Sequence, residues 1–202
     1  MKRNFKFIKI TLILICLAVQ SVGWTPVRAA GPICYVKQTA AGANNGASWS
    51  NAFTSLQSAL SDSGCSEIWV AAGTYRPGNP GARAAIFQLK NGTAIYGGFS
   101  GDETTREARN WTSYLSILSG DLDASGTKTT QDAYHVVTGS GVNLTAVLDG
   151  FTITGGFADG GGENSNGAGI YNNEGSPTLA NLLITDSKAT RDGGGMVNLN
   201  CS

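Results

Sequence analysis

The chain has 202 residues, with 14 basic and 14 acidic side chains and a formal net charge of zero. The first 30 residues contain five basic residues and no acidic one, so the remaining 172 carry nine basic against 14 acidic side chains. A mildly acidic body without clustered Lys and Arg excludes a nucleic-acid-binding surface. The chain is 41 % hydrophobic, which is too apolar for disorder, and its 28 glycines and 14 % charged residues are typical of short strands joined by turns.

The N-terminus has the layout of an export signal. Four basic residues in the first nine positions precede an apolar run at 10–19, and small residues follow at Ala29 and Ala30. This pattern predicts a secretory signal peptide over residues 1–30, cleaved after Ala29 or Ala30. The alternative is an uncleaved anchor, but about ten strongly apolar residues are few for crossing a bilayer. We therefore expect a secreted or outer-surface protein that meets the membrane only through this signal or a C-terminal anchor beyond residue 202.

Export changes the interpretation of the cysteines. In an oxidising compartment Cys34 and Cys65 are expected to form a disulfide, with two free buried thiols as the alternative. Cys201 is then left over, and we expect its partner to lie in sequence that follows residue 202.

Residues 31–75 are predicted to form an N-terminal cap of strand, helix and strand. The strands are expected at 33–37 and 67–71. Trp49, Phe53, Leu56 and Leu60 are spaced four, three and four apart, which predicts one amphipathic helix over 51–62, capped by Ser50 or Asn51. We expect this helix to cover the open end of the β structure that follows.

Residues 76–202 consist of short apolar segments separated by turns, with no helical periodicity between them. The predicted strands are 85–89, 94–96, 114–118, 134–138, 146–148, 151–154, 170–171, 179–185 and 196–199.

The last sixty residues contain an internal repeat. Residues 167–172 return 26 positions later at 193–198, and residues 151–154 return 31 positions later at 182–185. Strands that recur while the turn between them varies indicate a solenoid. The pattern predicts an all-β parallel β-helix in which Ile153 stacks on Ile184 and Ile170 on Met196, with an antiparallel β-sandwich as the alternative. Repeated asparagines at 172 and 198 are expected to form an amide ladder. Because the chain stops in mid-repeat, we expect it to be the N-terminal part of a longer solenoid.

Several segments in this order resemble a known group of proteins. Residues 42–49, 67–75, 117–121, 133–138 and 148–153 are similar to the opening of bacterial right-handed parallel β-helix proteins, in particular the choice-of-anchor Q group. The Gly-Ala-Gly-Ile at 167–170 also resembles repeats of polymorphic outer-membrane proteins. The resemblance implies a right-handed parallel β-helix that is secreted or attached to the cell surface, usually without known activity.

One run of acidic residues has the spacing of a calcium loop. Asp121, Asp123 and Ser125 occupy positions 1, 3 and 5, a glycine follows at position 6, and Asp132 occupies position 12. The four side chains are candidate calcium ligands. The alternative is a polar turn between coils, where Asp, Ser and Gly are common. No other cofactor is expected.

We find no catalytic constellation in the sequence. In the repeat register Asp149 aligns with Ala180 and Asp186 with Gly155, so no acid stacks on an acid, and His135 lies in an apolar strand segment. We therefore expect a non-enzymatic spacer or adhesin that binds extracellular glycans or proteins. The alternative is the N-terminal part of a β-helix polysaccharide lyase or glycoside hydrolase.

Overall fold

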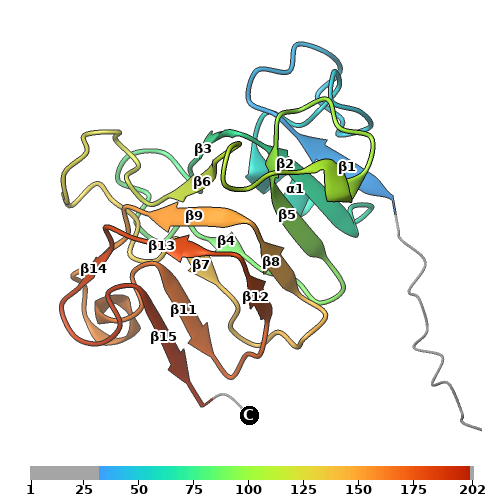
Figure 1. The fold of residues 1–202 in the computed structure, drawn as a ribbon. Helices are drawn as coiled ribbons and strands as arrows, with labels where there is room; N and C mark the ends of the chain where they lie inside the picture. Colours follow the sequence, from blue (N-terminus) through green and yellow to red (C-terminus); the bar gives the residue numbers. More distant parts are fainter. Residues whose placement is uncertain (1–31, 201–202) are drawn as a thin grey trace, which may run out of the picture.

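The computed structural model describes residues 32–200, which are mostly β structure with very little helix (Figure 1). The helices are α1 (Leu56–Ser61) and two short 3-10 turns, η1 (Arg106–Ala108) and η2 (Gly162–Ser165). The strands are β1 (Ile33–Val36), β2 (Glu67–Ala71), β3 (Gly73–Tyr75), β4 (Phe87–Gln88), β5 (Ala94–Phe99), β6 (Ser116–Ser119), β7 (Val137–Thr138), β8 (Val147–Asp149), β9 (Phe151–Thr154), β10 (Phe157–Ala158), β11 (Ile170–Asn173), β12 (Thr178–Ala180), β13 (Leu183–Ile184), β14 (Lys188–Ala189) and β15 (Met196–Leu199).

All strand pairs among the described residues are parallel. Three sheets contain most of the strands, in the orders β1-β2-β5-β8-β12, β3-β6-β9-β13 and β4-β7-β11-β15, and β10 pairs with β14. From β2 onward the chain visits the three larger sheets in the same order four times, and we call each passage a round. The rounds are β2-β3-β4, β5-β6-β7, β8-β9-β11 and β12-β13-β15. Each strand pairs with its equivalent in the next round, so every round adds one strand to each of the three sheets (Figure 1).

The core lies between the three sheets and consists of columns of apolar residues, one residue from each round. The strand register defines three such columns. They are Ile68, Ile95, Leu148 and Leu179 in the first sheet, Tyr75, Leu118, Ile153 and Ile184 in the second, and Phe87, Val137, Ile170 and Met196 in the third. The first three members of every column are buried, and the last member is partly buried. The predicted stacking of Ile153 on Ile184 and of Ile170 on Met196 is confirmed.

The predicted asparagine ladder is also confirmed. Asn172 is buried, and its Nδ2 donates to Oδ1 of Asn198 at 2.9 Å. Its Oδ1 accepts from the backbone N–H of Gly139 at 2.8 Å, one round earlier. A single amide therefore connects three successive rounds.

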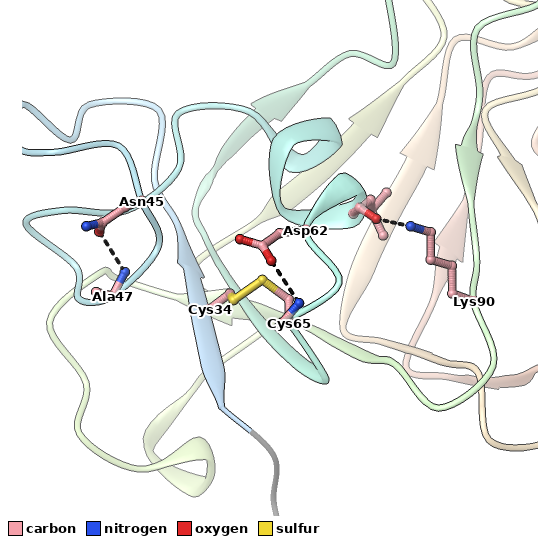
Figure 2. The surroundings of a disulfide bond; sticks show 8 residues. Cys34, Asn45, Ala47, Asp62, Cys65 and Lys90 are labelled. Carbon is pink, nitrogen blue, oxygen red and sulfur yellow. Dashed lines mark hydrogen bonds between the residues drawn. A yellow bond between two sulfur atoms is a disulfide. The ribbon is translucent and has the colours of Figure 1, made fainter.

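The predicted strands of the N-terminal region are confirmed as β1 and β2, which pair in parallel. Cys34 and Cys65 form the expected disulfide, with their Cα atoms 5.5 Å apart (Figure 2). Helix α1 buries Leu56 and Leu60 in the same core cluster as the column residues.

The prediction of a helix over 51–62 is wrong in its first half. The helix begins at Leu56, and Ser55 rather than Ser50 or Asn51 caps it by accepting from the N–H of Gln57 at 3.2 Å. Phe53 is instead extended beside β1, because its N–H donates to the carbonyl of Tyr35 and its carbonyl accepts from the N–H of Lys37, both at 2.9 Å.

Each of the nine strands predicted after residue 76 overlaps an observed strand. The segment 179–185 is divided by Asn181, whose φ of 49° turns the chain between β12 and β13. Strands β3, β10 and β14, which are two or three residues long, were not predicted from the sequence.

No helix in the part of the chain that the structure describes is long and apolar enough to cross a membrane. The predicted signal peptide at residues 1–30 and Cys201 both lie outside the described residues.

Candidate functional site

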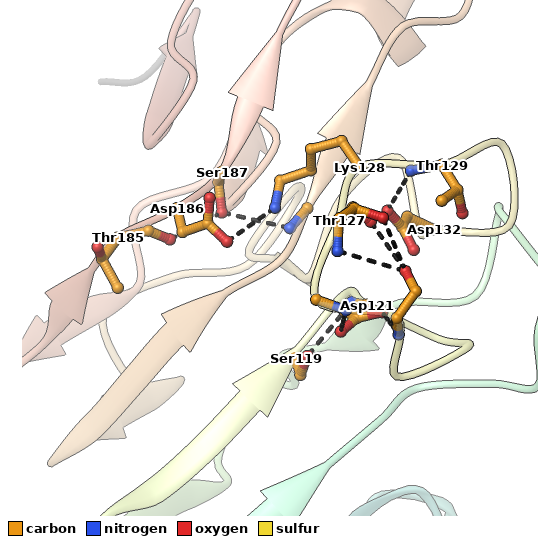
Figure 3. A network of polar contacts seen from close by, with 12 residues as sticks. Ser119, Asp121, Thr127, Lys128, Thr129, Asp132, Thr185, Asp186 and Ser187 are labelled. Carbon is orange, nitrogen blue, oxygen red and sulfur yellow. Dashed lines mark hydrogen bonds and ion pairs between the residues drawn. The ribbon is translucent and has the colours of Figure 1, made fainter.

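The candidate site is the loop between β6 and β7, which is closed at its base by a backbone hydrogen bond from Ala133 N–H to the carbonyl of Gly120 at 2.9 Å. Asp121 lies at the start of this loop and Asp132 near its end (Figure 3), and Asp123 comes two residues after Asp121. One carboxylate oxygen from each of the three lies within 4.8 Å of the others. We call these three side chains the acidic cluster.

Backbone hydrogen bonds hold the acidic cluster in shape. Asp121 accepts at Oδ1 from the N–H of Ser125 and at Oδ2 from the N–H of Gly126, both at 3.0 Å. Asp132 Oδ2 accepts from the N–H of Thr129 at 2.8 Å, and the hydroxyl of Thr129 donates to Asp123 Oδ2 at 3.2 Å. The loop therefore wraps around its own carboxylates.

Asp132 differs from the other two carboxylates. Its side chain is completely buried, and its Oδ1 has no hydrogen-bond partner. Burial raises the pKa of Asp132, and the negative charges of Asp121 and Asp123 raise it further. Hydrogen bonds from the side chain and backbone of Ser125 lower the pKa of Asp123, so this neighbour keeps its charge. The one lysine of the loop, Lys128, pairs with Asp186 at 2.9 Å.

The structure thus brings together three of the four residues predicted as calcium ligands. Ser125, the fourth, lies beside them: its N–H donates to Asp121 and Asp123, and its hydroxyl donates to the carbonyl of Thr127 at 3.1 Å. The flanking elements are strands, as expected from the sequence.

Two ion pairs among the described residues link different rounds. Arg109 binds Asp149 at 2.7 Å, and both side chains are largely buried. Arg83 pairs with Asp159 and also donates to the carbonyls of Asp132 and Phe157, both at 2.9 Å. Asp149 pairs in register with Ala180, as predicted.

His135 is a buried structural residue. Its Nδ1 lies 3.1 Å from the carbonyl of Gly167, which can only accept, so Nδ1 carries the proton. The ring stacks on Tyr171 with centroids 4.8 Å apart. Burial lowers the pKa of His135, so the imidazole is held neutral.

A second surface feature, which the sequence analysis missed, is an open groove of about 370 Å³ beside β9 and β13. Trp111, Leu115 and Leu183 line it and are exposed, and Thr112, Thr152 and Asn181 add polar groups. The guanidinium of Arg109 lies 4.8 Å over the Trp111 ring, which fixes the indole. Trp111 lies in an irregular connection, where no periodicity marks it in the sequence.

Comparisons of the chain with protein-family models, with curated proteins and with solved structures find no match. The fold and the two surface features therefore define the class: a mostly β protein of parallel sheets, with one observed disulfide and an acidic cluster in a long loop.

Proposed function

We propose that this protein is a non-enzymatic, secreted or cell-surface module with a right-handed parallel β-helix fold, which acts as a spacer and binds glycans. The observation that carries the proposal is the order of the strands: the chain visits the same three sheets four times, and each strand pairs with its equivalent in the next round. A solenoid accounts for this order, and crossovers between parallel strands are right-handed in nearly all proteins.

A solenoid of this kind suits a spacer. Each round contacts mainly its neighbours, so added rounds lengthen the molecule without requiring a larger core. The resemblance to bacterial surface β-helix proteins and the predicted signal peptide agree with this role. The disulfide between Cys34 and Cys65 fits an oxidising compartment outside the cytoplasm.

The groove at Trp111 is the surface best suited to a glycan. A sugar ring has an apolar face and a rim of hydroxyls, and the groove offers an exposed indole beside hydroxyl and amide groups. Trp111 is 38 % exposed and is already held by Arg109, so little side-chain freedom is lost on binding. One open groove gives weak affinity, which repeated display on a surface strengthens.

The test uses the secreted full-chain product at high density on beads, presented with soluble neutral and acidic polysaccharides. We expect Trp111→Ala to weaken binding about tenfold, which corresponds to about 1.4 kcal/mol. The matched control is Leu144→Ala, which removes a 71 % exposed apolar side chain that does not line the groove.

Two results would count against the proposal. Equal binding by Trp111→Ala and the parent protein would exclude the groove as the glycan site. Release of ultraviolet-absorbing unsaturated products from an acidic polysaccharide would show that the protein is a polysaccharide lyase and not a non-enzymatic spacer. N-terminal sequencing of the exported protein checks for cleavage after Ala29 or Ala30.

A further inference from the structure

We propose that the acidic cluster of Asp121, Asp123 and Asp132 binds one calcium ion, which locks the β6–β7 loop onto the body of the protein. This inference is independent of the proposed glycan binding, because the cluster and the Trp111 groove share no residue.

The spread of the carboxylate oxygens matches calcium. Oxygen ligands lie at about 2.3–2.6 Å from Ca²⁺, so two oxygens on opposite sides of the ion are about 4.6–5.2 Å apart. The three cluster oxygens lie within 4.8 Å of one another, a spread comparable with that span. Mg²⁺ demands near-ideal octahedral geometry and loses its water reluctantly, so three carboxylates held by a loop suit Ca²⁺ better.

The second observation is the buried oxygen of Asp132. A buried polar atom without a partner is costly, and more so when it belongs to a carboxylate. Asp132 Oδ1 is such an atom, although the other oxygen of the same side chain accepts a hydrogen bond from Thr129. No cation among the described side chains reaches it, because Lys128 is bound to Asp186 and Arg83 donates to the backbone carbonyl of Asp132. A calcium ion supplies the missing partner and offsets the repulsion among three carboxylates.

The position of the cluster determines what the ion would do. Asp121 lies two residues after the end of β6, and Asp132 precedes the buried segment that leads into β7. The loop between them extends to the last round through Lys128 and Asp186 (Figure 3). A bound ion joins the two ends of the loop and so restrains this contact between rounds. We therefore expect calcium to stabilise the folded protein.

The experiment is a calcium titration of the exported full-chain protein after removal of metal with a chelator. Isothermal titration calorimetry measures the stoichiometry, and thermal unfolding measures the stabilisation. We expect one equivalent of Ca²⁺ to bind, with half-saturation at or below the millimolar range found for extracellular modules. We also expect the unfolding temperature to rise with calcium and to rise much less with the same concentration of Mg²⁺.

Two variants and a control make the assignment specific. Asp123→Asn, on the partly exposed side of the cluster, is expected to weaken calcium binding at least tenfold and to retain the fold. Asp132→Asn is expected to abolish the calcium-dependent rise in unfolding temperature. Glu174→Gln removes an exposed carboxylate outside the cluster and is expected to bind calcium like the parent protein.

Three outcomes would overturn the proposal. The first is no heat and no thermal shift at millimolar calcium. The second is an equal calcium response in Asp123→Asn and Glu174→Gln. The third is a magnesium response as large as the calcium response.

Discussion

The disulfide between Cys34 and Cys65 provides a quantitative test of the N-terminal region. It joins β1 to the residues just before β2, with a sequence separation of 31. Breaking the bond frees a loop of about 31 residues in the unfolded chain, and the chain-entropy relation gives a loss of about 3.7 kcal/mol at 25 °C. We expect reduction to lower the free energy of unfolding by that amount.

The native state should change little on reduction. Both sulfur atoms remain in the core, where Cys34 and Cys65 are 8 % and 5 % exposed. Strand β1 is also held by pairing with β2 over all four of its residues. The loss therefore arises in the unfolded state, and for a folded unit of this size it corresponds to a fall in unfolding temperature of about 7–15 °C.

The assay is urea unfolding of the oxidised and reduced protein, followed by tryptophan fluorescence. Trp69 reports on this region, because its ring lies 5.6 Å from that of Tyr35 in β1. The control is the double variant Cys34→Ala, Cys65→Ala, whose stability should not respond to the reductant. A loss below about 1 kcal/mol would refute the reasoning, since it would mean that β1 does not unfold together with the rest of the protein.

Two further substitutions probe the connections between rounds. Asn172→Ala leaves the N–H of Gly139 buried without its acceptor and should lower the free energy of unfolding in urea by about 2 kcal/mol. Asn198→Ala, at the exposed end of the ladder, should lower it less, and an equal loss in the two variants would contradict this reasoning. The pKa of His135 is lowered by burial, so as pH falls through about 6.5 the unfolded chain binds the proton first and stability is lost. We expect His135→Gln to lose less stability than the parent protein between pH 7.5 and 5.5, and an identical pH dependence would contradict this.

The sequence predicts the last rounds of the fold better than the first. Strands β11 and β15 begin 26 residues apart, and β9 and β13 pair at an offset of 31, so recurring residues mark them. In the first sheet, β2 and β5 pair at Glu67 and Ala94, but β5 and β8 pair at Ala94 and Val147. A separation that nearly doubles from one round to the next hides the repeat, although the strands themselves remain detectable as apolar segments.

The misplaced helix start has a local cause. Phe53 has the spacing of a helix face relative to Leu56 and Leu60, but the backbone of Phe53 is used by Tyr35 and Lys37 in the neighbouring strand. Tertiary hydrogen bonds of this kind override a periodicity that spans only three turns. The sequence therefore identifies the residues that enter the core but not the conformation of the first of them.

The candidate calcium site was partly predictable. The spacing of Asp121, Asp123 and Asp132 indicates convergence, because a glycine at position 126 permits the turn between them. The spacing does not reveal that the hydroxyl of Ser125 bonds within the loop, or that Asp132 is buried. Both depend on how the loop packs against the rounds on either side.

The β5–β6 connection contains a carboxylate that shows what a purely structural acid looks like in this protein. Glu103 accepts at Oε1 from the N–H and hydroxyl of Ser100, and at Oε2 from the N–H groups of Gly101 and Asp102. Burial raises the pKa of Glu103, but these hydrogen bonds outweigh it and the pKa lies below the ordinary value.

In the acidic cluster of the next connection, by contrast, one carboxylate oxygen lacks a hydrogen-bond donor. Both oxygens of Glu103 are saturated by the loop that surrounds it, whereas Asp132 keeps one buried oxygen without a donor and its pKa moves upward, first because of burial. If the β6–β7 loop were only a turn, a donor within it would be expected to satisfy that oxygen, as happens around Glu103. A cation shared with Asp121 and Asp123 accounts for the difference between the two loops, and the chelator and calcium titrations measure it directly.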